Sequence, residues 1–548
     1  MTQEWITTSN QHAATSTEHS VVLLNGDAHQ SREILGGKGH SINAMRRHQL
    51  PVPPAFCITT EVGGRYLTAP EPTMEAIWDD VLDRMRWLEA ETSRTFGRGP
   101  RPLLVSVRSG AAQSMPGMMD TILDLGINTP VEQALAAADT SLIAHTFARD
   151  TRLRFTRTYR RIVGESDPLS TDPYTQLRAG IESVFSSWNS PRAVAYRTHY
   201  GLDDQGGTAV IVQAMVFGNQ GANSGAGVLF SRNPITGGSE PFGEWLPGGQ
   251  GDDVMSGLVD VQPITALRDD KPAVYDELMD AASHLERLGS DVQEIEFTVE
   301  DGKLWLLQTR TAERSAQAAV RLALQLRYEG LIDDAEALRR VTPAHVETVL
   351  LPPLRQEIRL AAPLLAKGMP ACPGVVSGKA YTEVDKALDA AEAGEQVILV
   401  RNHTRPEDVL GMLAAQGVVT EVGGVASHAA VVSRELGRVA VVGCGQGTVA
   451  SLAGKQITVD GDEGEVRHGN LTLSAWSEND TPELRELADI ARRISPLRAH
   501  ATGDHPRLDD SSDAAIRAAM DTGHTDVVST TPLIVMMTAL RLRSQAKP

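Results

Sequence analysis

The sequence has few cysteines, few aromatic residues and no long apolar run. Its three cysteines, Cys57, Cys372 and Cys444, lie far apart and form no CxxC pair, which gives no sign of a zinc site and favours a reducing compartment. No apolar stretch approaches the roughly 18 residues of a membrane-spanning helix. Residues 1–20 are polar and lack the features of a secretory signal. We therefore expect a cytoplasmic protein without a membrane span, and a disordered leader over residues 1–20.

Basic residues are also in short supply. The 51 Lys and Arg residues face 70 Asp and Glu residues, which gives a formal net charge of −19. A nucleic-acid surface needs clustered Lys and Arg to neutralise phosphates, so this balance argues against a nucleic-acid partner. It does not exclude small anionic ligands, because a few local basic residues are enough to bind them.

The order of expected elements divides the 548 residues into several domains. Strand-like and Gly-rich segments, with a mainly helical insert at about 131–200, occupy residues 21–311. Residues 312–365 are helical and then Pro-rich, which is typical of a connector and hinge. Short strands, glycines and helical pieces over residues 366–475 predict a compact α/β domain. Residues 476–548 follow as a C-terminal segment. The fold class is therefore a multidomain mixture of α/β and α+β.

One histidine stands out in the stretch "TEVGGVASHAAVVSREL" at residues 420–436. A strand and a Gly-Gly turn precede it, and Ser427 is a plausible N-cap for the helix that follows. His428 therefore lies in the first helical turn, where free backbone N–H groups stabilise an anion. A neutral imidazole is also a good nucleophile. The position suits a phosphohistidine, and the alternative is a histidine that caps the helix or fills a surface pocket.

A hairpin predicted over residues 293–310 carries a second signal. Asp301-Gly302 is a favoured two-residue turn, and alternate strand residues share a face. Glu294 and Glu296 lie on one face of the first strand, and Gln308 and Arg310 share a face of the second. If these faces coincide, the carboxylates are candidate ligands for Mg²⁺ bound to nucleotide phosphates, and the arginine is a candidate for phosphate charge. The alternative is a solvated edge hairpin with incidental charges.

Two Gly-rich stretches, "GGKGHS" and "SVRSGAAQSMPGMMDT", place Lys38 and Arg108 among small residues. Backbone amides in such loops can bind phosphate. The spacing is not that of a Walker A motif, and a flexible loop is the common alternative for each stretch alone.

Taken together, these stretches resemble the pyruvate, phosphate dikinase family, within a larger group that includes phosphoenolpyruvate synthase and rifampicin phosphotransferase. The "SMPGMMDT" stretch is similar to the dikinase version in particular. The matching stretches, in family order, are "GGKGHSINAM", "VPPAFCITTE", "VSVRSGAAQSMPGMMDTILDLGIN", "GTAVIVQAMVFGN", "GVLFSRNPITG", "IEFTVEDGKLWLLQTR", "PACPGVVSGKAY" and "GGVASHAAVVSRELG".

The resemblance implies an ATP-grasp-like nucleotide-binding domain over residues 21–311 and a swivelling phosphohistidine domain over residues 366–475. His428 falls at the family's phosphorylated histidine. The expected nucleotide-site residues are Lys38, Arg108, Glu294, Glu296, Gln308 and Arg310, with Glu296 and Glu294 as ligands of Mg²⁺.

The implied reaction converts ATP, phosphate and pyruvate into AMP, pyrophosphate and phosphoenolpyruvate. The histidine takes the pyrophosphoryl group of ATP, phosphate removes one phosphoryl as pyrophosphate, and the phosphohistidine passes the other to pyruvate.

Departures from the family pattern concern the histidine's neighbour and the acceptor. The chain reads Ala426-Ser427-His428 where the dikinases have Thr-Ser-His, so we expect no regulatory phosphorylation of a threonine there. The family's pyruvate site is a (β/α)₈ barrel of roughly 250 residues, and residues 476–548 resemble only its first units. Ser529-Thr530-Thr531-Pro532 replaces a Cys-Arg-Thr-Glu stretch with a substrate-binding arginine.

The acceptor and partners therefore stay open. The phosphohistidine could serve pyruvate, with or without a separate barrel-domain protein, or another small-molecule or protein acceptor as a phosphocarrier. A homodimer is a further option. A partial barrel leaves sheet edges unpaired, so we expect the C-terminal segment to be mobile, swapped or covered by a partner.

Overall fold

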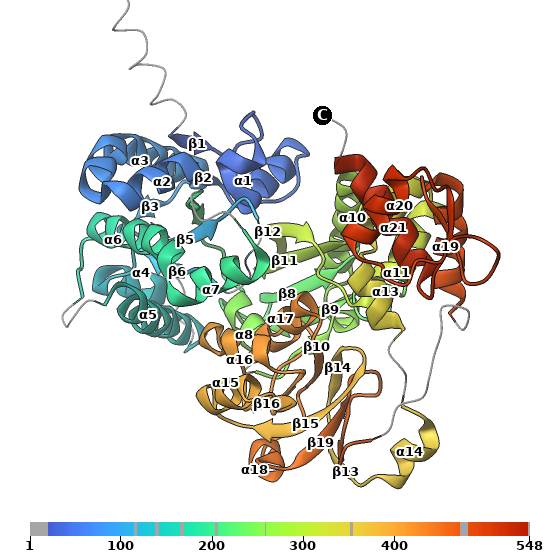
Figure 1. Ribbon diagram of the computed structural model, residues 1–548. Coiled ribbons are helices and arrows are strands. Elements are labelled where there is room, and N and C mark those ends of the chain that lie inside the picture. Colours follow the sequence, from blue (N-terminus) through green and yellow to red (C-terminus); the bar gives the residue numbers. More distant parts are fainter. Residues whose placement is uncertain are drawn as a thin grey trace, which may run out of the picture.

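Three large sheets organise the protein (Figure 1). The computed structural model describes residues 20–545, apart from residues 114, 116–117, 138–141, 165–168, 203–205, 258, 351–353 and 472–480. The expected disordered leader lies outside the described residues except for Ser20. Among the described helices, none combines the length and apolar character needed to cross a bilayer.

The first sheet is antiparallel and has the strand order β1-β2-β7-β5-β6. Helices α2, α3 and α6 contribute to the core on one of its faces, where Phe56, Val107 and Val212 are fully buried. The bounds are β1 (Val21–Leu23), β2 (Ala55–Ile58), β5 (Val105–Gly110), β6 (Thr121–Leu125), β7 (Ala209–Ala214), α2 (Thr60–Thr68), α3 (Pro70–Thr92) and α6 (Pro173–Ser186), with a small ladder of β3 (Thr95–Phe96) and β4 (Pro102–Leu103) beside them.

The expected insert at about 131–200 is helical. Its elements are the end of α4 (Thr129–Ala137), then α5 (Leu142–Val163), α6, η1 (Ser187–Asn189) and α7 (Pro191–Tyr200).

The second sheet is also antiparallel, in the order β10-β9-β8-β11-β12. The predicted hairpin is confirmed as β11 (Gln293–Glu300) and β12 (Lys303–Thr311), and Asp301 and Gly302 take φ values of +48° and +78° in its turn. The remaining elements of this sheet and its helices are β8 (Gly225–Phe230), β9 (Phe242–Pro247), β10 (Gln262–Pro263), α8 (Gly251–Ser256), α9 (Thr265–Asp270) and α10 (Pro272–Gly289).

Helix α1 (Arg32–Arg47) packs against both sheets. The sequence predicts a Gly-rich turn that leads into a helix, and the structure instead starts the helix earlier and kinks it at Gly36, with φ +69°. A Cβ on Gly36 would lie 1.6 Å from the carbonyl oxygen of Gly110 at the end of β5. Only glycine allows both this backbone conformation and this close approach, and together they fix where Lys38 lies.

The third sheet has eight strands in the order β13-β20-β19-β15-β16-β17-β18-β14, with parallel pairing from β15 to β18. It confirms the expected α/β character of this region. Its elements are β13 (Leu364–Lys367), β14 (Met369–Cys372), β15 (Val375–Tyr381), α15 (Val384–Glu392), β16 (Val397–Arg401), η2 (Pro406–Asp408), α16 (Val409–Ala414), β17 (Gly417–Thr420), α17 (His428–Leu436), β18 (Val439–Val442), α18 (Thr448–Leu452), β19 (Gln456–Asp460) and β20 (Glu465–His468).

The C-terminal segment shares one core with the connector helices. Leu338 and Val346 of the connector belong to the same apolar cluster as Leu487, Val527 and Leu533. The apolar side of this segment is thus covered by its own chain, which the sequence did not indicate. The elements are α11 (Ala316–Tyr328), α12 (Asp334–Arg340), α13 (Pro343–Val349), α14 (Gln356–Ala361), α19 (Pro482–Ile494), β21 (Arg498–His500), α20 (Asp513–Asp521), β22 (Asp526–Val528) and α21 (Pro532–Gln545).

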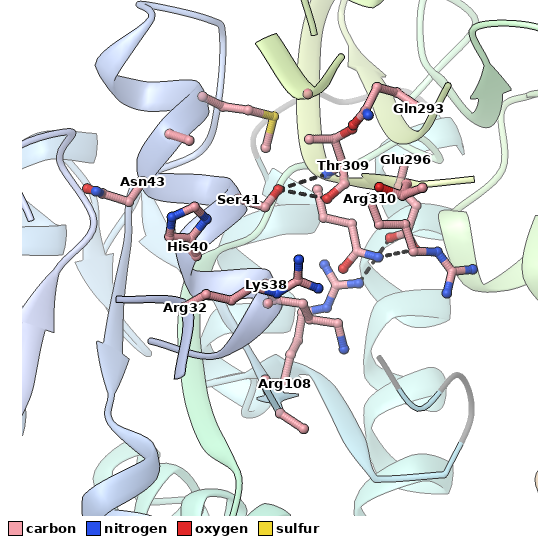
Figure 2. Close-up of a pocket in the computed structure, with 18 of the residues that line it drawn as sticks. Arg32, Lys38, His40, Ser41, Asn43, Arg108, Gln293, Glu296, Thr309 and Arg310 are labelled. Atoms are coloured by element: carbon pink, nitrogen blue, oxygen red, sulfur yellow. Dashed lines mark hydrogen bonds and ion pairs between the residues drawn. The ribbon is translucent and has the colours of Figure 1, made fainter. Parts of the chain in front are cut away.

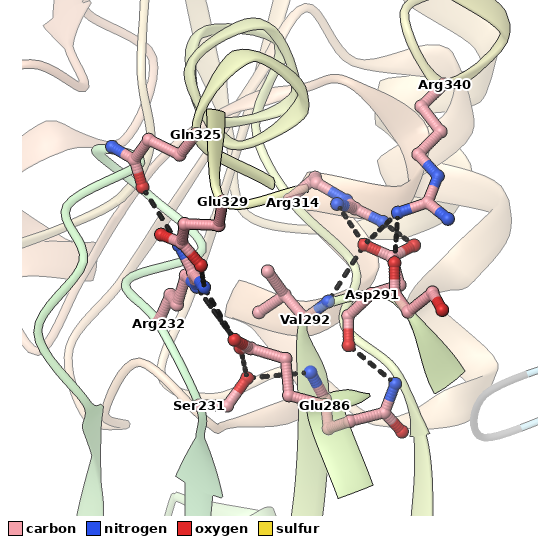
Figure 3. Close-up of polar contacts among 11 residues, drawn as sticks. Ser231, Arg232, Glu286, Asp291, Val292, Arg314, Gln325, Glu329 and Arg340 are labelled. Atoms are coloured by element: carbon pink, nitrogen blue, oxygen red, sulfur yellow. Dashed lines mark hydrogen bonds and ion pairs between the residues drawn. The ribbon is translucent and has the colours of Figure 1, made fainter. Parts of the chain in front are cut away.

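Buried ion pairs join the second sheet to the connector (Figure 3). Arg232, just beyond β8, donates to both carboxylate oxygens of Glu286 on α10 and also to Glu329 after α11. Asp291 accepts from Arg314 at 2.7 and 2.8 Å and pairs with Arg340 of α12 at 3.2 Å. The side chains of Arg232 and Glu286 are only 7% and 12% exposed, so their charges depend on each other.

We predict that Arg232→Ala lowers the free energy of unfolding by about 3–5 kcal/mol, because it leaves Glu286 buried without its cation. The matched control Arg339→Ala removes an arginine that is 72% exposed from its pair with Glu336 and should cost less than about 1 kcal/mol. Urea unfolding of the two variants measures the difference, and equal losses would contradict the structural role of the Arg232 network.

Candidate functional site

A cavity of about 900 Å³ lies between the first two sheets and α1. Five of the expected nucleotide-site residues line it: Lys38, Arg108, Glu296, Gln308 and Arg310. Figure 2 shows Lys38, Arg108, Glu296 and Arg310 converging from α1, β5 and the β11–β12 hairpin. The sixth, Glu294, is not among the described lining residues. The sequence also predicts a Gly-rich loop at 217–234 that could close over a nucleotide, and it does not contribute to the described lining.

The hairpin register explains how the polar side chains meet. Glu294 pairs with Arg310 and Glu296 with Gln308, and a bulge follows directly after Glu296. The two polar faces coincide because the bulge adds one residue, Leu307, to β12; the register of the two-residue turn alone would pair Glu296 with Leu307. Bulges often re-aim side chains beside functional sites, and here the change of register occurs where the polar pairs give way to the apolar pair of Phe297 and Leu306.

Glu296 lies at the centre of the polar group. Its Oε1 accepts from Gln308 Nε2 at 2.8 Å, and its Oε2 accepts from Arg108 at 3.0 Å. Gln308 Oε1 is buried without a hydrogen-bond partner among the described residues. An orphaned amide oxygen beside a carboxylate is the kind of oxygen ligand that Mg²⁺ prefers, so the residues present fit this ion.

Glu294 lies deeper than the cavity lining. Its side chain is 1% exposed, and its Oε1 accepts from Arg310 at 2.8 Å. Its Oε2 is buried and has no partner among the described residues. In this conformation Glu294 orients Arg310, and its second oxygen is shielded from the cavity.

Lys38 is the basic group of the α1 side. Its Nζ donates to the Ser109 carbonyl oxygen at 2.9 Å. Burial, reinforced by the positive charge of Arg108, lowers the Lys38 pKa from 10.5 to about 7, although Glu296 opposes this shift. An anion in the cavity would raise this pKa again because it offsets the neighbouring guanidinium charges.

His428 is the first residue of α17, as the sequence predicts, and Ser427 is the N-cap. The Ser427 hydroxyl does not cap the helix, since it donates to the Gly424 carbonyl oxygen at 2.7 Å. His428 Nδ1 lies 2.9 Å from Thr404 Oγ1, and its Nε2 is buried without a partner among the described residues. With a proton on Nδ1 shared with Thr404, Nε2 keeps a lone pair for nucleophilic attack.

Burial lowers the His428 pKa to about 4, and Arg192 acts in the same direction, whereas Asp408 and Glu407 oppose it. The imidazole is therefore neutral at pH 7. His428 is not among the described residues lining the cavity, so the structure brings the nucleotide-site candidates together and leaves the histidine apart from them.

Glu244 connects the two regions and is the residue that motif analysis missed. From β9, its carboxylate accepts from the backbone N–H groups of Val425 at 2.6 Å and Ala426 at 3.1 Å, just before His428. A Cβ on Gly424 would lie 1.9 Å from Glu244 Oε1. Burial raises the Glu244 pKa, and the two backbone hydrogen bonds oppose that shift. The sequence signal that could have identified Glu244 is a carboxylate in the otherwise apolar strand β9.

A second contact between the regions lies beside His428. Arg192 of α7 pairs with Asp120 at 2.6 Å and with Glu407 at 3.4 Å. Ala429 and Ala430 of α17 share an apolar cluster with Met115 and Met118 of the first region. We call these contacts, together with the Glu244 hydrogen bonds, the domain seam.

Two family models match the chain. Residues 74–277 match the pyruvate phosphate dikinase AMP/ATP-binding domain, and residues 393–464 match the mobile domain of PEP-utilising enzymes. Among solved structures, the solution NMR structure of an Enzyme I (nEIt) protein is 38% identical and covers 13% of this chain and 30% of that chain, with a TM-score of 0.12, which supports no statement about the fold.

Curated relatives match most of the chain. The pyruvate, phosphate dikinase of Clostridium symbiosum is 37% identical over 533 residues, and pyruvate, phosphate dikinase 2 of Zea mays is 38% identical over 529 residues; each match covers 87% of this chain and 60% of the relative. The Rhizobium meliloti dikinase is 37% identical over 538 residues, 85% of this chain and 59% of its own length. The chain thus spans about 60% of the length of these relatives, and over that length it is similar to the pyruvate, phosphate dikinases.

Proposed function

We propose that the chain carries out the nucleotide half of the pyruvate, phosphate dikinase reaction and holds the transferred phosphoryl group on His428. The observation that carries this proposal is that a neutral histidine, whose Nε2 has no partner among the described residues, lies on a domain packed against the one with the basic cavity. His428 takes the pyrophosphoryl group of ATP and releases AMP. Phosphate then removes the outer phosphoryl group as pyrophosphate, and pyruvate receives the remaining one to give phosphoenolpyruvate.

The cavity residues have distinct roles in this proposal. Lys38 and Arg108 bind phosphate oxygens, and Arg310, oriented by Glu294, offsets the charge of the transferring group. Glu296 and Gln308 at the cavity, with Glu294 behind them, would hold Mg²⁺, which would supply positive charge to offset that of the phosphates. His428 and the cavity are separate in this conformation, so the proposal includes a rearrangement at the domain seam before phosphoryl transfer.

The domain assignments belong to the same proposal. Two antiparallel sheets flanking a cavity support an ATP-grasp-like domain over residues 21–311, and the eight-stranded unit supports a phosphohistidine domain over residues 366–475. Residues 312–365 are the connector and hinge. The parallel pair of β21 and β22 with intervening α20 supports a barrel-like unit in residues 476–548. Three free cysteines fit a cytoplasmic location.

A different acceptor is the second candidate. Where the family has a substrate-binding arginine, this chain has the stretch Ser529–Pro532, and Ser529 is buried with its backbone N–H bonded to the His500 carbonyl oxygen. The four described residues of this stretch supply no guanidinium for a carboxylate substrate. Delivery of the phosphoryl group to another small molecule, to a protein or to a separate barrel-domain protein is therefore the alternative to pyruvate.

We predict that β-labelled ATP gives an acid-labile label on the wild-type protein and none on His428→Ala. The β-label should persist after phosphate is added, whereas label from γ-labelled ATP should leave as pyrophosphate. The control His468→Ala, an exposed histidine of the same domain, should label normally. Label on His428→Ala would contradict the proposal, and a pyruvate chase then separates the two acceptor candidates.

We predict that ATP binding takes up close to one proton at about pH 8, because Lys38 is mostly neutral above its pKa of about 7 and recharges beside the triphosphate. Calorimetry in buffers of different ionisation enthalpy measures this uptake. It should disappear in Lys38→Met, while the control Lys386→Met, at an exposed position of α15, leaves it unchanged. Equal uptake in Lys38→Met and wild type would assign the proton elsewhere.

We predict that the His428 ring stays neutral down to about pH 5, since its pKa is about 4 rather than 6.5. The unfolded chain binds this proton at higher pH than the folded chain, so this group destabilises the fold progressively as the pH falls from 6.5 towards 4. Nitrogen-15 NMR of the imidazole, assigned with His428→Gln, follows the titration. A midpoint near 6.5 would show that the ring is not protected by burial.

A further inference from the structure

Two histidines and an aspartate lie together in the C-terminal segment, away from the cavity and the domain seam. In His500, His505 and Asp526, one potential ligand atom from each residue lies within 4.8 Å of the others. His500 Nε2 is 3.0 Å from Asp526 Oδ1, and the rings of His500 and His505 stack with centroids 4.9 Å apart. This group, the His-His-Asp cluster, has no part in the proposed phosphoryl transfer.

The two short strands β21 and β22 position two of the three residues of the cluster, His500 and Asp526. β21 and β22 are parallel, with Arg498 opposite Asp526 and His500 opposite Val528. His500 and Asp526 therefore share one face of the pair. The intervening residues Ala499 and Val527 are 0% and 1% exposed in the core shared with the connector, which fixes the orientation of the polar face.

The loop that carries His505 is held against the same strand. Val528 N donates to the Pro506 carbonyl oxygen at 2.9 Å, and Leu508 N donates to the Val528 carbonyl oxygen at 2.8 Å. Arg507 also forms a bridge with Val528. These backbone contacts begin at the residue directly after His505, so the imidazole stands beside β22 although it is exposed.

The carboxylate of Asp526 is oriented from its other side. Its Oδ2 accepts from Arg498 at 2.7 Å and from Thr525 Oγ1 at 2.9 Å, which leaves Oδ1 towards His500. Partners of this kind orient metal-ligating carboxylates in proteins. An ion pair between His500 and Asp526 alone would account for one contact, but it does not account for the second imidazole.

We propose that His500, His505 and Asp526 bind one Zn²⁺ ion. Imidazole nitrogen and carboxylate oxygen are ligands of this ion, at about 2.0–2.2 Å, and three protein ligands leave a fourth position for water or another ligand. Mg²⁺ is a poor competitor, since it prefers an octahedral set of oxygens. The site fastens the 501–512 loop to β22, and this inference is independent of the proposed phosphoryl transfer.

The test is equilibrium dialysis of the full chain against Zn²⁺, with excess Mg²⁺ present to occupy the carboxylate site of the cavity. The wild-type protein should retain one zinc ion per chain. His505→Gln, a change at an exposed position, should lower the zinc affinity by more than the roughly 10–100-fold loss typical of an outer partner. His524→Gln, an exposed histidine of the same segment outside the cluster, should bind zinc as the wild type does.

A spectroscopic readout makes the result independent of any folding defect. Co²⁺ should give a visible absorption band in the wild type that is absent in His505→Gln, and Zn²⁺ should shift the ring resonances of both His500 and His505. Equal zinc binding by the wild type and His505→Gln, or ring resonances that Zn²⁺ does not move, would overturn the proposal and leave only the His500–Asp526 ion pair.

Discussion

The position of His428 depends on a carboxylate from another domain. Glu244 accepts the N–H groups of Val425 and Ala426 and so holds the loop that leads into α17. This contact requires Gly424, because any side chain there would collide with the Glu244 carboxylate. The burial at the seam keeps the imidazole neutral, so its nucleophilic form and its location have the same cause. A buried charge of this kind is stable only while its hydrogen-bond partners remain, which links the ionisation of Glu244 to the packing of the two domains.

In the cavity, two carboxylates at different depths each pair with an arginine. Glu296 faces the cavity between Arg108 and Gln308, while Glu294 lies behind it and pairs with Arg310. The outer carboxylate is accessible to a ligand, and the inner one determines the orientation of an arginine. Lys38 joins this group from α1 with a lowered pKa. A ligand with several negative charges would relieve repulsion among three basic side chains at once, which suits a nucleotide triphosphate better than a neutral molecule.

Local patterns in the sequence predicted the hairpin well. Alternation placed Glu294 with Glu296 and Gln308 with Arg310, but the register of the Asp-Gly turn alone would leave these two pairs on opposite faces, and the bulge after Glu296 brings them together. Alternation along a strand predicts which face of the sheet a side chain occupies, but not how deeply it is buried. It therefore could not reveal that Glu294 lies beneath the residues that line the cavity. The start of α17 at His428 was likewise readable from the Gly-Gly turn and the serine before it.

Contacts between distant segments were beyond such patterns. The Glu244 hydrogen bonds join residues 181 and 182 positions apart, and no local signal specifies that pairing. The kink at Gly36 depends on its approach to Gly110, so a turn was expected where a bent helix occurs. The packing of α19 and α21 on the connector could not be predicted from the sequence either. The apolar face of an amphipathic helix shows that the helix is packed, but not which element it packs against.

The shared core of the connector and the C-terminal segment has a geometric consequence. Those two segments come before and after the eight-stranded unit in the chain, and they pack on each other in one core, while α11 of the connector also packs on the second sheet. Both ends of the unit are therefore connected in the chain to segments that share one apolar core. A domain connected at two points rotates mainly about the line through them. The eight-stranded unit would therefore move along an arc rather than diffuse in all directions.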